Sequence, residues 1–224
     1  MKKILDFNSK DFSKDINDYI SNNRSTNSDV SEKVKVIIDS IISKGDESLS
    51  KLTLKYDSYD INKYGIRVSK KDINEAYKEC DKELVNALEK ASERISNFHE
   101  LQLPSDISYK DNSNVHLSSR WTPLDSVGLY VPGGKASYPS SVIMTAIPAK
   151  IAKVPEVAMC VPSPNGYLNS SILVAAKICG VENIYKIGGA QAIAAMAYGT
   201  KSVIKVNKIF GPGNAWVAEA KRQL

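Results

Sequence analysis

The second half of the chain alternates short apolar runs with longer segments in which apolar residues recur every three or four positions. The short runs have the length of strands: VGLYV, EVAMCV, NIYKI and NKIF. The segments between them have the period of helices: SSVIMTAIPAKIAK, SSILVAAKICG and AQAIAAMAYG, and a further helical pattern follows NKIF. Strand and helix alternating at this spacing predict a parallel sheet with right-handed crossovers. Residues 127–224 are therefore predicted to form an α/β domain.

The start of the chain predicts a helix that stands apart from the rest. Phe12, Ile16 and Ile20 lie four positions apart, which predicts a short amphipathic helix over residues 11–20. The polar run SNNRSTNSD follows and is typical of a linker. We therefore expect the first helix to behave as an arm.

Further helices are predicted before the sheet. The run SEKVKVIIDSIISKG indicates a helix with an N-cap at Ser31 and a stop at Gly45, and a second helix follows over residues 46–56. Steps of three and four then predict a long helix that ends before Pro104 and is buried along one stripe. This stripe comprises Leu84, Leu88, Ala91, Ile95 and Phe98.

A β-hairpin is predicted between the long helix and the sheet. Two alternating runs flank a turn in ISYKDNSNVHLSSRWTPL. The region before residue 127 is therefore expected to be mainly helical, with one hairpin.

Charge and cysteine content narrow the class of protein. The net charge of +5 comes from lysines scattered among acidic residues, which predicts solvated helix faces and no nucleic-acid partner. The start MKKILDFNSKDF has no apolar stretch typical of a signal peptide, and no run approaches membrane-spanning length, so no membrane partner is expected. Three widely spaced cysteines without a C-x-x-C pair suit reduced thiols, which favours a cytoplasmic protein.

The histidines do not predict a metal site. His99 and His116 have no cysteine or histidine neighbour at metal-ligand spacing. We interpret both as ordinary surface or hydrogen-bonded residues, and we expect no zinc site made by this chain alone.

Three predicted strands run into glycine-rich turns. They are LYVPGGK at 129–135, KIGGAQA at 186–192 and IFGPGNA at 209–215. Ligands of open α/β sheets bind at the carboxyl ends of the strands, where such turns gather. Glycine permits close approach of the backbone, and the following helix presents free N–H groups to an anion. The turns predict a crevice for a phosphorylated or extended ligand, with tight strand-to-helix turns alone as the alternative.

Three polar side chains adjoin these turns and are predicted to converge on the crevice. Tyr130 ends the first strand, Gln191 opens the helix after the second turn, and Asn214 opens the helix after the third. Each has a simpler alternative: strand-end packing for Tyr130, a solvated helix start for Gln191 and helix capping for Asn214. No catalytic acid, base or nucleophile is predicted after residue 127, because Cys160 has no partnering base and is interpreted as a buried hydrophobe.

The glycine-rich blocks are specific enough to indicate a family. GLYVPGGKASYPSSVIMTAIPAKIA, KICGVENIYKIGGAQAIAAMAYGT and KIFGPGNAWVAEAKRQL closely resemble histidinol dehydrogenase, collinearly from about residue 30. The resemblance implies a two-stage oxidation of histidinol through an aldehyde to histidine, with two NAD molecules and a bound zinc ion. It assigns the NAD contacts to Tyr130, Gln191 and Asn214. The zinc ligands and the Glu-His acid-base pair have no match here and are expected beyond Leu224.

The resemblance also implies the architecture. The family has incomplete Rossmann-like domains and forms interlocked homodimers, so we expect an N-terminal helical arm (1–25), a first incomplete α/β domain with helices and a hairpin (26–126), and a Rossmann-like NAD-binding domain (127–224). The family's chains are longer, and the helix that begins at Asn214 stops soon with an apolar stripe. We therefore expect this chain to be the front portion of the enzyme, inactive alone; a complete, non-catalytic nucleotide-binding or subunit-interaction module is the alternative.

Overall fold

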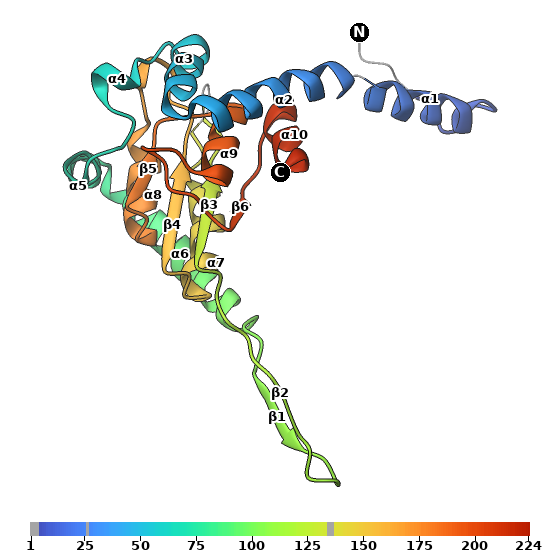
Figure 1. Ribbon diagram of the computed structural model, residues 1–224, viewed down its shortest axis with the longest axis vertical. Coiled ribbons are helices and arrows are strands. Elements are labelled where there is room, and N and C mark those ends of the chain that lie inside the picture. The colour runs from blue at the N-terminus through green and yellow to red at the C-terminus, as the bar shows by residue number, and fades with distance from the viewer. Residues whose placement is uncertain (1–4, 26, 134–136) are drawn as a thin grey trace.

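The protein forms a layered body from which one helix and one hairpin project in different directions (Figure 1). The computed structural model describes residues 5–25, 27–133 and 137–224, without the side chains of residues 22–28. None of the helices in these ranges is long and apolar enough to cross a membrane.

A four-stranded parallel sheet, of order β5-β4-β3-β6, lies at the centre of the body. Every residue of β3 is buried, which is typical of a parallel strand covered on both faces. The sheet confirms the predicted fold class and each predicted strand. The strands are β3 (Ser126–Tyr130), β4 (Glu156–Cys160), β5 (Asn183–Tyr185) and β6 (Lys208–Phe210).

The helices that follow these four strands also occur where the apolar period predicts them. They are α7 (Pro139–Ile151), α8 (Ser170–Cys179), α9 (Gly189–Tyr198) and α10 (Ala215–Gln223), and a short 3₁₀ turn, η1 (Pro164–Gly166), precedes α8. Helices α7 and α8 pack on one another, as do α9 and α10, and the two pairs belong to different hydrophobic clusters.

Five helices of the first half complete the layers. They are α2 (Asn27–Lys44), α3 (Asp46–Asp57), α4 (Ile61–Tyr64), α5 (Lys70–Glu79) and α6 (Lys82–Glu100). Helices α5 and α6 pack on α8, and α6 also packs on α7, whereas α2 contacts α9 and α10. Helices from both sides of residue 126 thus bury against one sheet, while the predicted domain boundaries stay predictions.

The predicted linker after residue 20 is wrong. Helix α1 (Phe12–Ser25) continues through the polar run and α2 begins at Asn27; residue 26 lies outside the described residues. Ser31 is therefore inside a helix rather than at its N-cap, and Gln223 of α10 donates to the Ser31 carbonyl oxygen at 2.9 Å. Serine and asparagine each disfavour a helix by only about 0.5 kcal/mol relative to alanine. Contacts between helices can therefore outweigh this preference. Figure 1 shows α1 beyond the end of α2, away from the sheet, as an arm would lie.

The helix stop at Gly45 is confirmed, and the stripe on the long helix is confirmed only in part. Gly45 has a φ of 51° between α2 and α3, a value that suits glycine. On α6, Leu88 is buried as predicted, but Leu84 and Phe98 are exposed. Helix α6 packs on α7 and α8, and among the described residues this packing leaves Leu84 and Phe98, near the two ends of the stripe, exposed.

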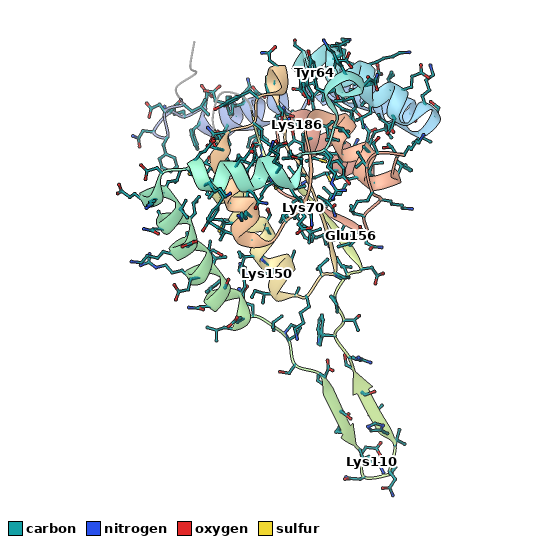
Figure 2. All side chains as sticks on the ribbon, turned by 90° about the vertical axis from the view of Figure 1, so that its left-hand side faces the viewer. Tyr64, Lys70, Lys110, Lys150, Glu156 and Lys186 are labelled. Carbon is teal, nitrogen blue, oxygen red and sulfur yellow. The ribbon has the colours of Figure 1, made fainter. Side chains whose placement is uncertain are left out.

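The predicted hairpin is confirmed and extends far from the body. Strands β1 (Ile107–Lys110) and β2 (His116–Ser119) pair antiparallel, and every residue in them is exposed. Figure 2 shows Lys110 near the far end of this projection. Its exposed side chains include several large apolar ones, among them Ile107, Tyr109 and Leu117.

Candidate functional site

The turns that follow β3, β5 and β6 surround one cleft of about 750 Å³. Because the strands are parallel, their carboxyl ends share one edge of the sheet. Tyr130, Gln191 and Asn214 all line this cleft, so the structure brings the three predicted residues together as expected. The volume lies in the range usual for small-molecule sites.

A second cavity, of about 600 Å³, lies at the opposite ends of the strands. Lys150 and Glu156 line it, and Figure 2 shows both well away from Lys186, which follows β5. Ligands of open α/β sheets bind at the carboxyl ends of the strands, so the first cleft is the candidate site.

Tyr130 is the last residue of β3 and is only 3% exposed. Its hydroxyl oxygen accepts a hydrogen bond from the N–H of Gly189 at 3.1 Å, which ties the end of β3 to the start of α9. Burial raises the pKa of Tyr130 to about 12. The hydrogen bond with the Gly189 backbone lowers this pKa, whereas the nearby Cys160 and Asp57 raise it. The phenol is therefore protonated at neutral pH and keeps its O–H as a donor.

Gln191 lies in the first turn of α9 and is 2% exposed, so the solvated helix start proposed as its alternative is wrong. Its amide makes no hydrogen bond to another side chain or backbone group in the described part of the chain, although the residue lines the cleft. A Cβ at Gly189 would lie 2.7 Å from Gln191 Oε1, so glycine leaves the room that this amide occupies. An amide that lines a cleft without a protein partner is suited to bind a ligand.

Asn214 caps α10, as its simpler alternative predicts. Its Oδ1 accepts hydrogen bonds from the N–H groups of Trp216 at 3.1 Å and Val217 at 3.2 Å. Its Nδ2 has no hydrogen-bond acceptor among the described residues, and Asn214 lines the cleft. One side chain can therefore cap the helix through oxygen and donate to a ligand through nitrogen.

The third glycine turn needs glycine for its backbone. Gly211 has a φ of 115°, and a Cβ there would collide with the carbonyl oxygen of Tyr130. Lys221 of α10 donates from Nζ to the Gly211 carbonyl at 2.5 Å and so fastens the turn. The alternative interpretation, a glycine required by a tight strand-to-helix turn, is therefore confirmed at Gly211. This role does not exclude a ligand beside the turn. The end of the first turn, residues 134–136, lies outside the described residues.

The structure adds residues to the site that sequence reasoning did not select. Asp57, at the end of α3, and Trp216, in α10, both line the cleft. Three prolines, each following a strand, also line it: Pro132, Pro162 and Pro212. The prolines were a usable signal, because each lies within two residues of a strand end that the apolar pattern predicts. Nothing in the local pattern indicates that α3 reaches the cleft.

The chemistry of the cleft favours binding over reaction. The first turns of α9 and α10 lie beside it, and such helix starts favour anionic groups such as phosphate. Cys160 is completely buried, and burial raises the pKa of its thiol, which confirms the interpretation as a buried hydrophobe. The described residues hold no cluster of three or more His, Cys, Asp or Glu that could bind a metal ion.

Comparisons with known proteins indicate the family of this chain. The family model described as histidinol dehydrogenase matches residues 20–224. Histidinol dehydrogenase of Gluconobacter oxydans is 47% identical over 222 residues, 99% of this chain and 52% of that protein. The enzyme of Mesorhizobium japonicum is 49% identical over 214 residues, 96% of this chain and 50% of that protein. The chain thus spans about half the length of these curated relatives.

A solved structure supports the same relationship. The crystal structure of histidinol dehydrogenase from Elizabethkingia anophelis matches with a TM-score of 0.82 at 35% sequence identity, over 86% of this chain and 44% of that one. Sequence and fold agree over nearly all of this chain, and we conclude that it belongs to the histidinol dehydrogenase family.

Proposed function

We propose that the protein that carries this chain oxidises L-histidinol to L-histidine through the aldehyde, and that the cleft at the carboxyl ends of β3, β5 and β6 binds NAD. The observation that carries the proposal is the convergence of Tyr130, Gln191 and Asn214 on one cleft. These are the positions that the resemblance assigns to NAD. Membership of an oxidoreductase family supports the reaction type.

The residues of this chain fit a dinucleotide. The starts of α9 and α10 would receive its phosphate groups, and the amides of Gln191 and Asn214 and the phenol of Tyr130 would hydrogen-bond its polar atoms. NAD, when bound, accepts a hydride from the substrate carbon. The chain's own contribution is to hold and orient the dinucleotide in the cleft.

The zinc ion that the resemblance implies does not fit the described residues. They offer no group of three or more His, Cys, Asp or Glu side chains that could bind a metal ion. No step is therefore assigned to zinc here.

Binding of NAD is the direct test. In a Trp121→Phe background Trp216 is the remaining tryptophan of this sequence, and it lines the cleft, so its fluorescence should change saturably on titration with NAD. Asn214→Ser keeps an N-cap oxygen but removes Nδ2, and we expect it to weaken NAD binding about tenfold, equivalent to roughly 1.4 kcal/mol. An unchanged affinity would remove Asn214 from the site.

The second candidate is a non-catalytic nucleotide-binding or subunit-interaction module, which the lack of histidine in the described cleft favours. Protein made from the complete native coding frame distinguishes the two. Reduction of NAD on addition of histidinol supports the enzyme, whereas saturable NAD binding without reduction supports the module.

A homodimer is part of the proposal. The hairpin projects from the body with exposed apolar residues, including Tyr109 and Leu117, and an isolated two-stranded hairpin is marginally stable in water. We expect light scattering of the purified protein to give twice the protomer mass, and Tyr109→Ser with Leu117→Ser to shift the mass toward the monomer. A wild-type protein that is monomeric at micromolar concentration would contradict this.

A further inference from the structure

Asp57 is a buried acidic residue that the NAD contacts assigned above do not include. It is the last residue of α3, is 9% exposed and lines the cleft. Its Oδ2 is buried and has no hydrogen-bond partner in the described part of the chain. Buried polar atoms of proteins are nearly always hydrogen-bonded, so this carboxylate needs an explanation.

No described residue compensates for burying the charge of Asp57. Asp57 takes part in none of the salt bridges between described residues, and burial raises the pKa of its carboxyl group. A raised pKa means that the folded state holds the proton more tightly than the unfolded state does. Above the unfolded pKa, the ionised carboxylate therefore lowers the stability of the fold. A residue that weakens the fold while lining a cleft is typical of a ligand-binding position.

The cleft has two electrostatically different sides. The starts of α9 and α10 favour phosphate, because helix N-termini carry partial positive charge. Asp57 lies at the carboxyl end of α3, where the negative end of the helix dipole adds to the charge of the carboxylate. This side disfavours an anion and favours a group that donates a hydrogen bond.

We infer that Asp57 accepts a hydrogen bond from a ribose hydroxyl of the bound dinucleotide and disfavours a ribose that carries a phosphate. The inference rests on the proposed binding of NAD. Rotation about the Cβ–Cγ bond exchanges the two carboxylate oxygens, so either one can meet a donor in the cleft. Ionised acceptors form the stronger hydrogen bonds to hydroxyl groups, so the carboxylate oxygen that turns toward the cleft is suited to accept from a ribose O–H.

Two substitutions separate the charge from the acceptor. Asp57→Asn keeps the shape but removes the charge, and it should reduce the preference for NAD over NADP at least tenfold. Asp57→Ala removes the acceptor, and it should weaken NAD binding at least tenfold. Both variants should unfold at the same or a higher urea concentration than the wild type, since an unpaired buried charge is removed. Glu47→Gln, which neutralises an exposed acid on the same helix, is the matched control and should change neither affinity.

The measurements are calorimetric titrations with NAD and NADP and urea unfolding of the same samples, all on protein from the complete native coding frame. A wild type that binds neither nucleotide would overturn the proposed function itself. A wild type that binds NAD, with variants that keep its affinity and its preference, would overturn only the role of Asp57. Variants that lose both binding and stability would also overturn it, because they would indicate a structural residue.

Discussion

Replacing Gln191 with methionine is expected to weaken NAD binding about ten- to a hundredfold without loss of stability. Gln191 is 2% exposed and lines the cleft, and its amide has no protein partner among the described residues. We therefore expect the amide to hydrogen-bond a ligand. Loss of one or two ligand hydrogen bonds costs roughly 1.4 to 2.8 kcal/mol, which is this range of affinity. Methionine has a similar volume and no polar atom to desolvate, so the free energy of unfolding should stay equal or rise.

Gln223→Met is the matched control for this experiment. The same exchange at the end of α10 removes hydrogen bonds to Ser31 outside the cleft. We expect it to lower the free energy of unfolding while NAD affinity is unchanged. NAD titration and urea unfolding of both variants give opposite patterns if Gln191 binds ligand. Equal NAD affinity of Gln191→Met and wild type would show that Gln191 is only a core residue.

Gly211→Ala is expected to destabilise the protein by about 2 to 4 kcal/mol. The backbone has a φ of 115°, which other residues rarely adopt, and a Cβ would collide with the backbone oxygen of Tyr130. Relief would move the turn away from β3, and with it Asn214 and the start of α10. We therefore expect a lower midpoint of urea unfolding and weaker NAD binding in the same variant.

Gly180→Ala separates backbone strain from collision. Gly180 has a φ of 80° at the end of α8, but no atom lies within 4 Å of a Cβ added there. It should cost only about 1 kcal/mol, since the strain of the left-handed conformation is the whole effect. If the two alanine variants unfold at the same urea concentration, close packing of Gly211 on Tyr130 does not contribute.

The local pattern of apolar residues was sufficient to predict the strands and helices of the second half of the chain and their order. The apolar runs that end at Tyr130 and Cys160 are strands, and the segments with helical period between them are helices, because backbone geometry fixes which side chains share a face. Parallel pairing then follows from the crossovers, and it places the three glycine turns at one edge of the sheet. This is why Tyr130, Gln191 and Asn214 could be selected together from the sequence.

Tertiary contacts decided what no local pattern encodes. The segment that begins at Asn27 is helical as part of α2, which packs along α9 and α10, and polarity alone does not distinguish an exposed helix from a linker. Leu84 is exposed although its period matches a buried stripe, since burial depends on where the neighbouring helices end.

The same distinction divides the candidate site. The sheet, the glycine turns and the polar residues beside them could be predicted from the sequence, because each depends on residues close along the chain. Packing between distant segments decided that α3 brings Asp57 to the cleft and that Gln191 is buried. Whether a side chain is buried depends on packing between segments that are distant in sequence. The apolar period of one segment carries no information on that packing.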